Sequence, residues 1–373
     1  MRQQAENGNG GEIRVLLVED SPTALELIRR MLASAPEIAI VGTAGNGLEA
    51  LELIPLVRPD VICTDLHMPK MDGFELTREV MARHPLPILV LSISVQAEQK
   101  HNIFQTLEAG AVDILAKPLG GLHIDFGVTA HDLITKIRIL SGVKVIGRRG
   151  AARNAVAIQP PPFLGAPSAP AARIIGIGAS TGGPQALEGI LRQLPADFAL
   201  PLVCVQHIAE GFMQGLVDWL ASSCRIRVRT AEEGTEPRPG SAYFPPDDRH
   251  LEIDPEGRFR CSGALPLSGH RPSVDIAFSS LACRYGAAAV GVLLTGMGQD
   301  GAQGLLEIAR AGGLTIAQDE QSSVVFGMPR RAIELGAARH VLPLAQIGPA
   351  LCGLAAGKAL RPNSLGAAAA GRS

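Results

Sequence analysis

The sequence predicts two α/β domains, each built on a doubly wound parallel sheet and joined by a linker. Short apolar runs alternate with longer amphipathic stretches from Ile13 to about Leu140, and the same alternation returns from Arg173 to roughly Leu360. The stretch between them is rich in Pro, Ala and Gly and has no periodicity. A chain of 373 residues is also longer than one ordinary core holds, which favours two domains.

The first predicted domain covers residues 12–140 and alternates five strands with five helices. Its strands are expected in the apolar segments IRVLLVED, IAIVGTAG, DVICTDL, LPILVLSIS and DILAKP. Helical patterns such as SPTALELIRRMLAS lie between them. Right-handed crossovers between parallel strands then give the doubly wound sheet.

The second predicted domain covers residues 173–360, with strands in RIIGIGAS, LPLVCVQHI and AAAVGVLLTGMG. Residues 141–172 form the predicted linker, and residues 361–373 are expected to be a flexible tail. This half of the chain therefore follows the same α/β plan as the first.

Composition and charge exclude several classes of protein. Hydrophobic residues make up 46% of the chain and charged residues 19%, as in a globular protein. The net charge of −2 and the absence of a basic patch in the sequence argue against nucleic-acid binding. The six cysteines show no CxxC spacing, which fits a reducing cytoplasm. No apolar run reaches the roughly 18 residues of a membrane span, so we expect a cytoplasmic protein with no direct membrane insertion.

Polar side chains follow the predicted strands of the first domain. Glu19 and Asp20 follow the first strand, Asp65 the third, Ser92 the fourth and Lys117 the fifth. The carboxyl ends of parallel strands meet at one edge of a sheet, so these groups are expected to gather there. Neighbouring carboxylates repel unless a hard cation joins them, and oxygen ligands suit Mg²⁺. Each acid alone could be an ordinary solvated group, but the set indicates a carboxylate that attacks a phosphoryl group, with Asp65 as the central candidate.

Residues 13–140 also resemble a response-regulator receiver domain. The matching motifs are VED at 18–20, DLHMPKMDG at 65–73, Ser92, and KP at 117–118. The resemblance implies a flavodoxin-like fold in which a partner histidine kinase phosphorylates Asp65. Many receivers carry an aromatic switch residue three positions before the lysine, but Ile114 occupies that position here, so an aromatic switch is not expected.

The same resemblance implies the roles of the other residues at this edge. Glu19, Asp20, Asp65 and the backbone carbonyl of His67 would hold Mg²⁺ for phosphorylation. Ser92 and Lys117 would sense the phosphate.

In the second half, the stretch GIGASTGGP joins a predicted strand to a predicted helix. It contains the pattern GxSxG with Ser180 at its centre, and a sharp turn in this context exposes the serine hydroxyl beside helix amides that can stabilise an oxyanion. The turn could equally only close a strand against a helix. Binding of a dinucleotide is not favoured, because the glycines follow GxGxxxG and the next strand ends in His207 instead of an acid.

Two further strand ends supply the partners that a nucleophilic serine needs. His207 ends the next predicted strand, and the later strand runs into Asp300, so both can converge with Ser180 at one sheet edge. In such a triad the histidine takes the serine proton and returns it to the leaving group, while the aspartate orients the imidazole. Alone, the histidine could be structural and the aspartate could cap a helix. Together the three predict a serine hydrolase with a Ser-His-Asp triad.

A second source of an acid and a base is PPDDRHLEI, where Asp247 or Asp248 could act with His250. This Pro-rich turn could also only shape the cleft. Hydrolysis by a metal is not indicated, because the sequence has no HExxH motif and no close Cys/His ligand cluster.

Residues 173–350 resemble the catalytic domain of chemotaxis protein-glutamate methylesterases. The matching motifs are GASTGGP, QH at 206–207, SVD at 273–275, TGMGQDGA, AGGLTIAQDE and VVFGMP. The resemblance implies a Rossmann-like esterase, activated by phosphorylation, that hydrolyses glutamyl methyl esters on chemoreceptors and deamidates selected receptor glutamines.

The resemblance also implies the residues of this esterase. Ser180, His207 and Asp300 would be its triad, with Thr181 and the Met297 backbone amide assisting the oxyanion and no cofactor in the esterase domain.

Two other functions stay open on the sequence alone. The second domain could have lost catalysis and serve as a phosphorylation-dependent module that binds receptors or the kinase, although the complete set of Ser180, His207 and Asp300 argues against this. A free-standing esterase for small molecules is disfavoured by the receiver-like first domain.

Overall fold

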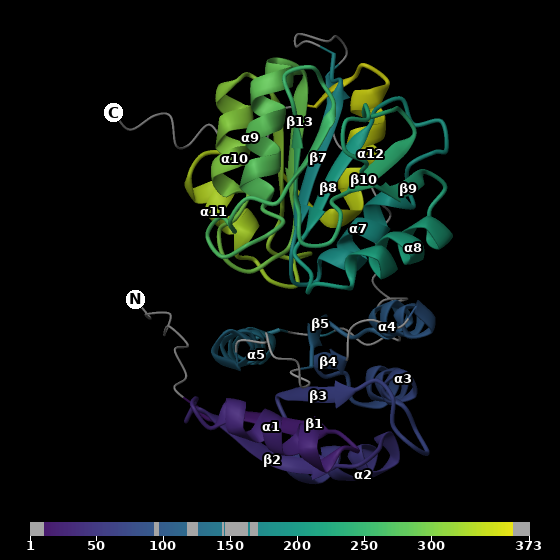
Figure 1. Cartoon of the computed structure of the whole chain (residues 1–373), viewed down its shortest axis with the longest axis vertical. Helices are drawn as coiled ribbons and strands as arrows, with labels where there is room; N and C mark the ends of the chain where they lie inside the picture. The colour runs from purple at the N-terminus through teal and green to yellow at the C-terminus, as the bar shows by residue number, and fades with distance from the viewer. Residues whose placement is uncertain are drawn as a thin grey trace, which may run out of the picture. The chain divides into compact units, whose positions relative to one another are not determined.

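A computed structural model of the chain describes residues 11–92, 97–117, 126–143, 145, 163–164 and 171–360. The chain divides into two compact units, and each unit contains its own parallel sheet (Figure 1). The predicted fold class, two parallel-sheet α/β domains, is confirmed. Most of the predicted linker and all of the predicted tail lie outside the described residues, and the predicted domain limits stay predictions.

The first unit has a five-stranded sheet in the order β2-β1-β3-β4-β5, with every neighbouring pair parallel. The strands are β1 (Ile13–Val18), β2 (Ile38–Ala44), β3 (Val61–Asp65), β4 (Ile88–Ser92) and β5 (Asp113–Ala116). Along the chain from residue 13 to residue 140 these strands alternate with the helices α1 (Pro22–Leu32), α2 (Gly47–Val57), α3 (Gly73–Arg83), α4 (Ala97–Ala109) and α5 (Phe126–Leu140). The alternation of five strands and five helices is confirmed.

Local sequence explains how the first unit presents its strand ends. All residues of β3 and β4 are buried, as in a parallel strand covered on both faces. Helix α1 begins after Ser21, whose hydroxyl accepts a hydrogen bond from the Ala24 N–H, and Asp72 caps α3 in the same way. These caps fix the short loops that carry the acids after β1 and β3.

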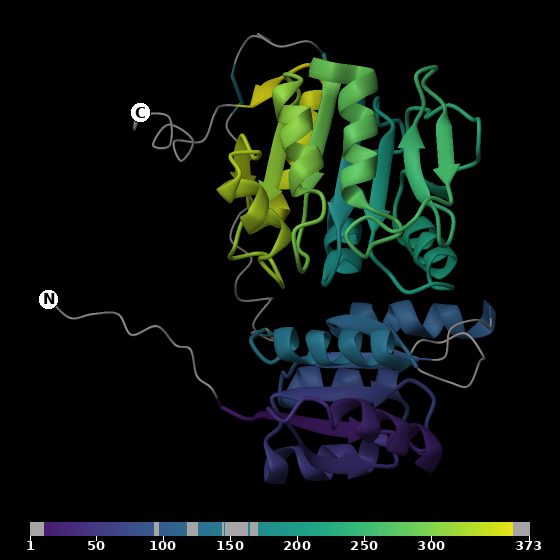
Figure 2. The same cartoon turned by 60° about the vertical axis from the view of Figure 1, so that its left-hand side comes forward.

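The second unit has a seven-stranded sheet in the order β15-β14-β13-β7-β8-β10-β9, again with parallel neighbours. Its strands are β7 (Ile174–Ala179), β8 (Leu202–Gln206), β9 (Arg227–Thr230), β10 (Ser241–Phe244), β13 (Ala289–Leu293), β14 (Leu314–Gln318) and β15 (His340–Leu342). Its α-helices are α7 (Gly183–Leu191), α8 (Met213–Ser223), α9 (Val274–Tyr285), α10 (Ala302–Arg310), α11 (Met328–Glu334) and α12 (Leu344–Ala355). Helices α9, α10 and α11 cover one face, and α7, α8 and α12 cover the other (Figures 1 and 2).

Two small antiparallel pairs were not predicted. A hairpin of β11 (His250–Ile253) and β12 (Phe259–Ser262) packs against α9, and β6 (Phe163–Leu164) pairs with β16 (Ala359–Leu360). The second pair includes two residues of the predicted linker, Phe163 and Leu164. Strands this short depend on the strand with which they pair, so their own residues do not define them.

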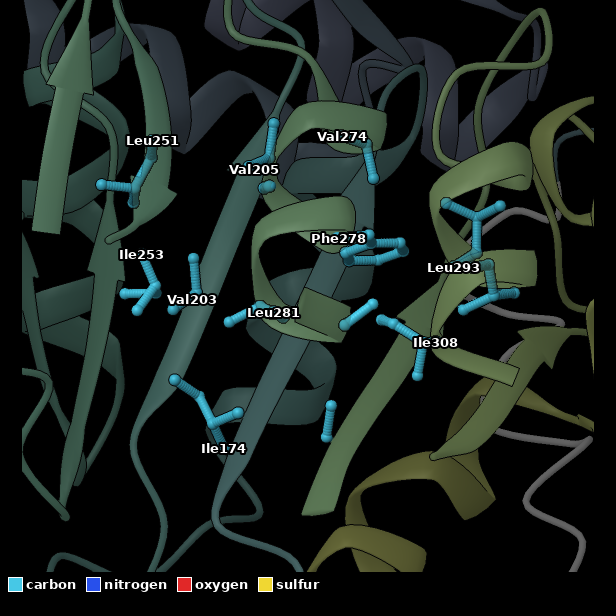
Figure 3. Packing of buried hydrophobic residues seen from close by; sticks show 14 of the residues in the cluster. Ile174, Val203, Val205, Leu251, Ile253, Val274, Phe278, Leu281, Leu293 and Ile308 are labelled. Carbon is cyan, nitrogen blue, oxygen red and sulfur yellow. The ribbon is translucent and has the colours of Figure 1, made fainter. Parts of the chain in front are cut away.

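The core of the second unit places α9 directly on the sheet. Figure 3 shows Val274, Phe278 and Leu281 following one another along this helix, with hairpin residues on one side of them and Leu293 of β13 on the other. Gly178 of β7 allows this approach, because a Cβ there would lie 2.2 Å from Cγ1 of Val274. The N-terminus of α9 is thereby held beside the carboxyl end of β7.

No helix within the described ranges combines the length and the apolar character that a membrane span requires.

Candidate active site

Ser180, His207 and Asp300 follow three strands that are neighbours in the sheet. Ser180 follows β7, His207 follows β8, and Asp300 lies in the loop after β13, while the sheet order is β13-β7-β8. The chain passes from β7 to one side of the sheet and later returns through β13 on the other side. In an open α/β sheet the crevice at such a switch point is where ligands bind.

Ser180 lies in a tight turn between β7 and α7. Its N–H donates to the Thr295 carbonyl at 3.0 Å, and its carbonyl accepts from the Gly183 N–H at 2.7 Å. Gly182 precedes the helix with a φ of 73°, a conformation that favours glycine. The side chain of Ser180 is partly exposed, and within the described residues no hydrogen bond joins its hydroxyl to His207.

His207 is held through one ring nitrogen. Its Nε2 lies 2.8 Å from Oδ2 of Asp300, and its side chain is only 10% exposed. A carboxylate only accepts, so Nε2 donates and the neutral ring carries a lone pair on Nδ1. That Nδ1 atom is buried and has no hydrogen-bond partner among the described residues. It is therefore the ring nitrogen free to take a proton.

Asp300 is 2% exposed and is surrounded by donors. Besides His207, its oxygens accept from the Ser273 hydroxyl at 2.9 Å and from the backbone N–H groups of Val274, Asp275 and Gly301 at 2.7 to 3.0 Å. The first two of these amides open α9, so the carboxylate caps that helix, where a negative charge is favoured.

The donors decide the charge of Asp300. Burial alone would raise the pKa of its carboxyl, but the hydrogen bond and charge of His207 and the amides of Val274 and Asp275 outweigh burial and lower it. Asp300 therefore stays ionised beside His207.

Asp275 lies beside Asp300 and His207, and the pKa of its carboxyl is raised, whereas that of Asp300 is lowered. Its Oδ1 accepts from the Gly304 N–H of α10 at 2.7 Å. Burial, and after it the Asp300 charge, outweigh that bond and raise the pKa of the Asp275 carboxyl to about 6. The two acids thus cap each other's helices, Asp300 at α9 and Asp275 at α10.

The two predicted oxyanion groups lie on the loops around Ser180. Thr181 follows the serine directly, and its carbonyl accepts from the Thr295 hydroxyl at 3.0 Å. Met297 lies in the loop after β13, and no acceptor for its backbone N–H is found among the described residues. Their role toward an oxyanion stays a prediction.

The alternative acid and base are used elsewhere. Asp247 accepts from the Gly211 and Met213 N–H groups at the start of α8. His250 is fully buried, with Nδ1 accepting from the Ser273 N–H at 3.1 Å and Nε2 3.2 Å from the Leu265 carbonyl. Both ring nitrogens of this histidine are occupied by backbone, which favours a structural role for PPDDRHLEI.

Gln206 belongs to the site, although the sequence assigned it no role. Its Nε2 donates to the carbonyls of Ser180 and His207, each at 2.8 Å. The side chain is buried between the two residues it joins. Its place next to His207 in the QH motif was the only signal in the sequence.

The first unit gathers the predicted charged groups at the carboxyl edge of its sheet. Lys117 Nζ lies 2.6 Å from Oε2 of Glu19 and 2.8 Å from Oδ2 of Asp65. Oxygens of Glu19, Asp20 and Asp65 lie within 4.8 Å of one another, which fits a hard divalent cation. Burial raises the pKa of the Glu19 carboxyl despite its bond to Lys117.

Ser92 and His67 are the other two predicted site residues at this edge of the sheet. Ser92 ends β4, is buried, and accepts on its carbonyl from the Lys117 N–H at 2.7 Å. The His67 side chain is exposed after β3, and the use of its carbonyl as a metal ligand stays a prediction.

Both halves of the chain match known protein families. The CheB methylesterase family matches residues 175–351, and the response regulator receiver domain matches residues 15–124. The chain is therefore a response regulator whose second domain is a methylesterase domain.

The relatives are similar over nearly the whole chain. A protein-glutamate methylesterase/protein-glutamine glutaminase of Nitrosospira multiformis is 43% identical over 348 residues, 92% of this chain and 97% of that protein. A protein of the same description from Syntrophus aciditrophicus is 42% identical over 92% of this chain and 98% of its own. The crystal structure of the Thermotoga maritima CheB methylesterase catalytic domain is 39% identical, with a TM-score of 0.48 over 49% of this chain and 98% of that chain. The chain belongs to the protein-glutamate methylesterase/protein-glutamine glutaminase family.

Proposed function

We propose that this protein hydrolyses methyl esters of glutamate side chains on chemoreceptors and deamidates selected receptor glutamines during chemotaxis adaptation, under the control of phosphorylation at Asp65. Family membership supports the reaction and the substrate class. The observation that carries the mechanism is the His207–Asp300 hydrogen bond of 2.8 Å beside the strand end that bears Ser180.

The acylation step uses Ser180 as the nucleophile. Its hydroxyl oxygen attacks the ester carbonyl carbon while Nδ1 of His207 takes the hydroxyl proton. Asp300 stabilises the imidazolium that forms. As the tetrahedral intermediate collapses, the C–OCH₃ bond breaks and the imidazolium returns its proton to the leaving oxygen, which departs as methanol.

The deacylation step repeats this proton transfer with water. Water attacks the acyl-enzyme while His207 takes one of its protons, and Ser180 leaves with that proton. The glutamic acid side chain that forms then releases the second proton of the water to solvent and becomes a carboxylate. For a glutamine substrate the first leaving group is ammonia. Thr181 and the Met297 amide are the groups we expect to stabilise the oxyanion in both steps.

Control is proposed to act through Asp65, with a histidine kinase as phosphodonor. A carboxylate oxygen of Asp65 attacks the phosphorus while the bond from phosphorus to the histidine nitrogen of the kinase breaks, so the imidazole is the leaving group. The Lys117 ammonium, 2.8 Å from the Asp65 carboxylate, offsets the added negative charge. Glu19, Asp20 and Asp65 would hold Mg²⁺, which neutralises phosphoryl charge when bound. Ser92 would donate its hydroxyl to a phosphoryl oxygen.

Methanol release from membranes that carry methylated receptors tests this proposal, with and without acetyl phosphate as phosphodonor. We expect release from the wild type, stimulation by acetyl phosphate, and loss on the order of 10³-fold or more in Ser180→Ala. A serine-reactive phosphonate should label the wild type and not the variant. Ordinary turnover by Ser180→Ala would contradict the mechanism. Receptor binding without any methanol release from the wild type would instead favour the binding-module alternative.

A further inference from the structure

A second histidine lies against the proposed base. The ring of His270 stacks on the ring of His207, with 4.1 Å between centroids and 12° between planes. His270 is partly buried in the loop between β12 and α9. The proposed mechanism gives this residue no task, although it contacts the ring that must gain and lose a proton.

The backbone around His270 is tightly defined. Leu267 and His270 exchange both backbone hydrogen bonds, at 3.1 and 3.0 Å. Between them Ser268 and Gly269 both have positive φ angles, 52° and 85°, as in a tight type I′ turn. The turn therefore presents the His270 ring from a fixed position.

Contacts on both sides anchor this loop to the rest of the unit. The Arg271 guanidinium bonds both oxygens of Asp248, and His250 lies 3.2 Å from the Leu265 carbonyl. Bidentate pairs of this kind fix direction as well as distance. The segment PPDDRHLEI thus serves the site indirectly, by holding the loop that carries His270.

His207 needs such support, because its ring has a single hydrogen bond within the part of the chain that the structure describes. The contact to Asp300 fixes Nε2, but Nδ1 has no partner among the described residues, so the hydrogen bond alone leaves the ring free to turn about that contact. We propose that His270 is a positioning residue: its ring holds the plane of the His207 imidazole so that Nδ1 stays available to Ser180. This inference rests on the proposed function.

His270 is neutral, which suits a residue that positions the His207 ring. Burial, and after it the charge of His207, outweigh the attraction of Asp300 and lower the pKa of His270 to about 4. His207 and Asp300 are the titratable groups that face it. A neutral His270 ring leaves the imidazolium of His207 unopposed by a like charge during turnover, whereas a cation at this distance would disfavour it.

Three substitutions separate the plane of the ring from its charge. His270→Ala removes the plane, His270→Phe keeps a neutral plane, and His270→Arg keeps a plane that can stack but carries a permanent charge. In the full-length protein with acetyl phosphate, kcat and KM for methanol release are measured from about pH 5 to pH 9. The exposed His84 supplies a matched control, His84→Ala.

We expect kcat to fall about 10- to 100-fold in His270→Ala with KM little changed, because a misoriented base slows chemistry and not binding. His270→Phe should recover most of that loss. In His270→Arg the acid limb of kcat/KM should move to lower pH, because the added positive charge disfavours protonation of the neighbouring base.

Two results would overturn the inference: full activity in His270→Ala, or a His270→Phe variant no better than His270→Ala while both melt at the wild-type temperature. Ser180→Ala is assayed in parallel. If it is inactive while His270→Ala is fully active, only the positioning role fails. If Ser180→Ala is itself active, the proposed triad fails.

Discussion

Replacing Asp300 by asparagine tests a residue that both caps a helix and orients the proposed base. Both oxygens of the Asp300 carboxylate act as acceptors in all the hydrogen bonds that they make within the described residues. Oδ1 accepts from the Ser273 hydroxyl and from the amides of Asp275 and Gly301, while Oδ2 accepts from His207 and the Val274 amide. An asparagine NH₂ group must therefore face backbone donors in either orientation.

The cost can be worked out from these contacts. At the Oδ1 position the NH₂ group would deprive the amides of Asp275 and Gly301 of their acceptor, whereas at the Oδ2 position the Val274 amide is the one backbone donor that loses its acceptor. The second orientation loses fewer bonds, so Asp300→Asn should lower the free energy of unfolding of the second unit by about 1–3 kcal/mol, the cost of one buried donor left without an acceptor. The charge at 2.8 Å from His207 is also lost, a Coulomb term of about 6 kcal/mol at an effective dielectric constant of about 20. Activity should fall by about 10³- to 10⁴-fold.

Trp219 makes the stability measurement specific to this unit. It is the chain's only tryptophan and is 4% exposed in α8. Urea unfolding followed by its fluorescence gives the change in free energy, and methanol release gives the change in activity. The exposed Asp197 supplies the control Asp197→Asn, which should change neither. Wild-type stability in Asp300→Asn, or activity within tenfold of the wild type, would refute the assigned contacts.

Three further substitutions give independent tests. Asp65→Asn should prevent the alkali-labile phosphoprotein that acetyl phosphate and Mg²⁺ produce in the wild type, because an amide is not the required nucleophile; equal labelling would place the phosphosite elsewhere. Because the pKa of Asp275 is raised to about 6 in the folded protein, its protonated carboxyl contributes stability that is lost as the pH rises from about 4 to 6. In Asp275→Asn the free energy of unfolding, measured with urea across this pH range, should therefore decline less steeply than in the wild type. The same decline in both proteins would contradict the raised pKa of Asp275. Gln206→Leu removes both donors to the neighbouring carbonyls, so kcat for methanol release should fall about tenfold with wild-type KM, and an unchanged kcat would show that the bridge is dispensable.

The parts of the fold and site that follow from local pattern were predicted well. Buried runs such as β3 and β4 identify parallel strands, because both of their faces are covered. Once the strands are parallel, their last residues must share one edge. The proximity of His207 to Asp300, and of Lys117 to Asp65, was predictable for that reason.

The parts that depend on distant contacts were not predictable. A lone aspartate before a helix suggests a cap for that helix, yet Asp300 caps α9, which begins 26 residues earlier in the chain. The stack of His270 on His207 joins residues 63 positions apart, and the loop that carries His270 is anchored by the pair of Arg271 with Asp248, which lie 23 positions apart. No periodicity in the sequence encodes such contacts. They arise only after the sheet has assembled.

The bridge made by Gln206 limits how this enzyme can be switched off. One side-chain amide ties the backbone of the proposed nucleophile to that of the proposed base, so these two residues move as a single body. Separating them would break these two hydrogen bonds, each worth about 0.5–1.5 kcal/mol, and would leave the Ser180 carbonyl with the Gly183 N–H as a donor. An inactive state in which the two are pulled out of alignment is therefore disfavoured. We expect the unphosphorylated enzyme to keep an assembled catalytic centre and to be inhibited because its large protein substrate cannot reach that centre. A small ester should therefore react at similar rates before and after phosphorylation.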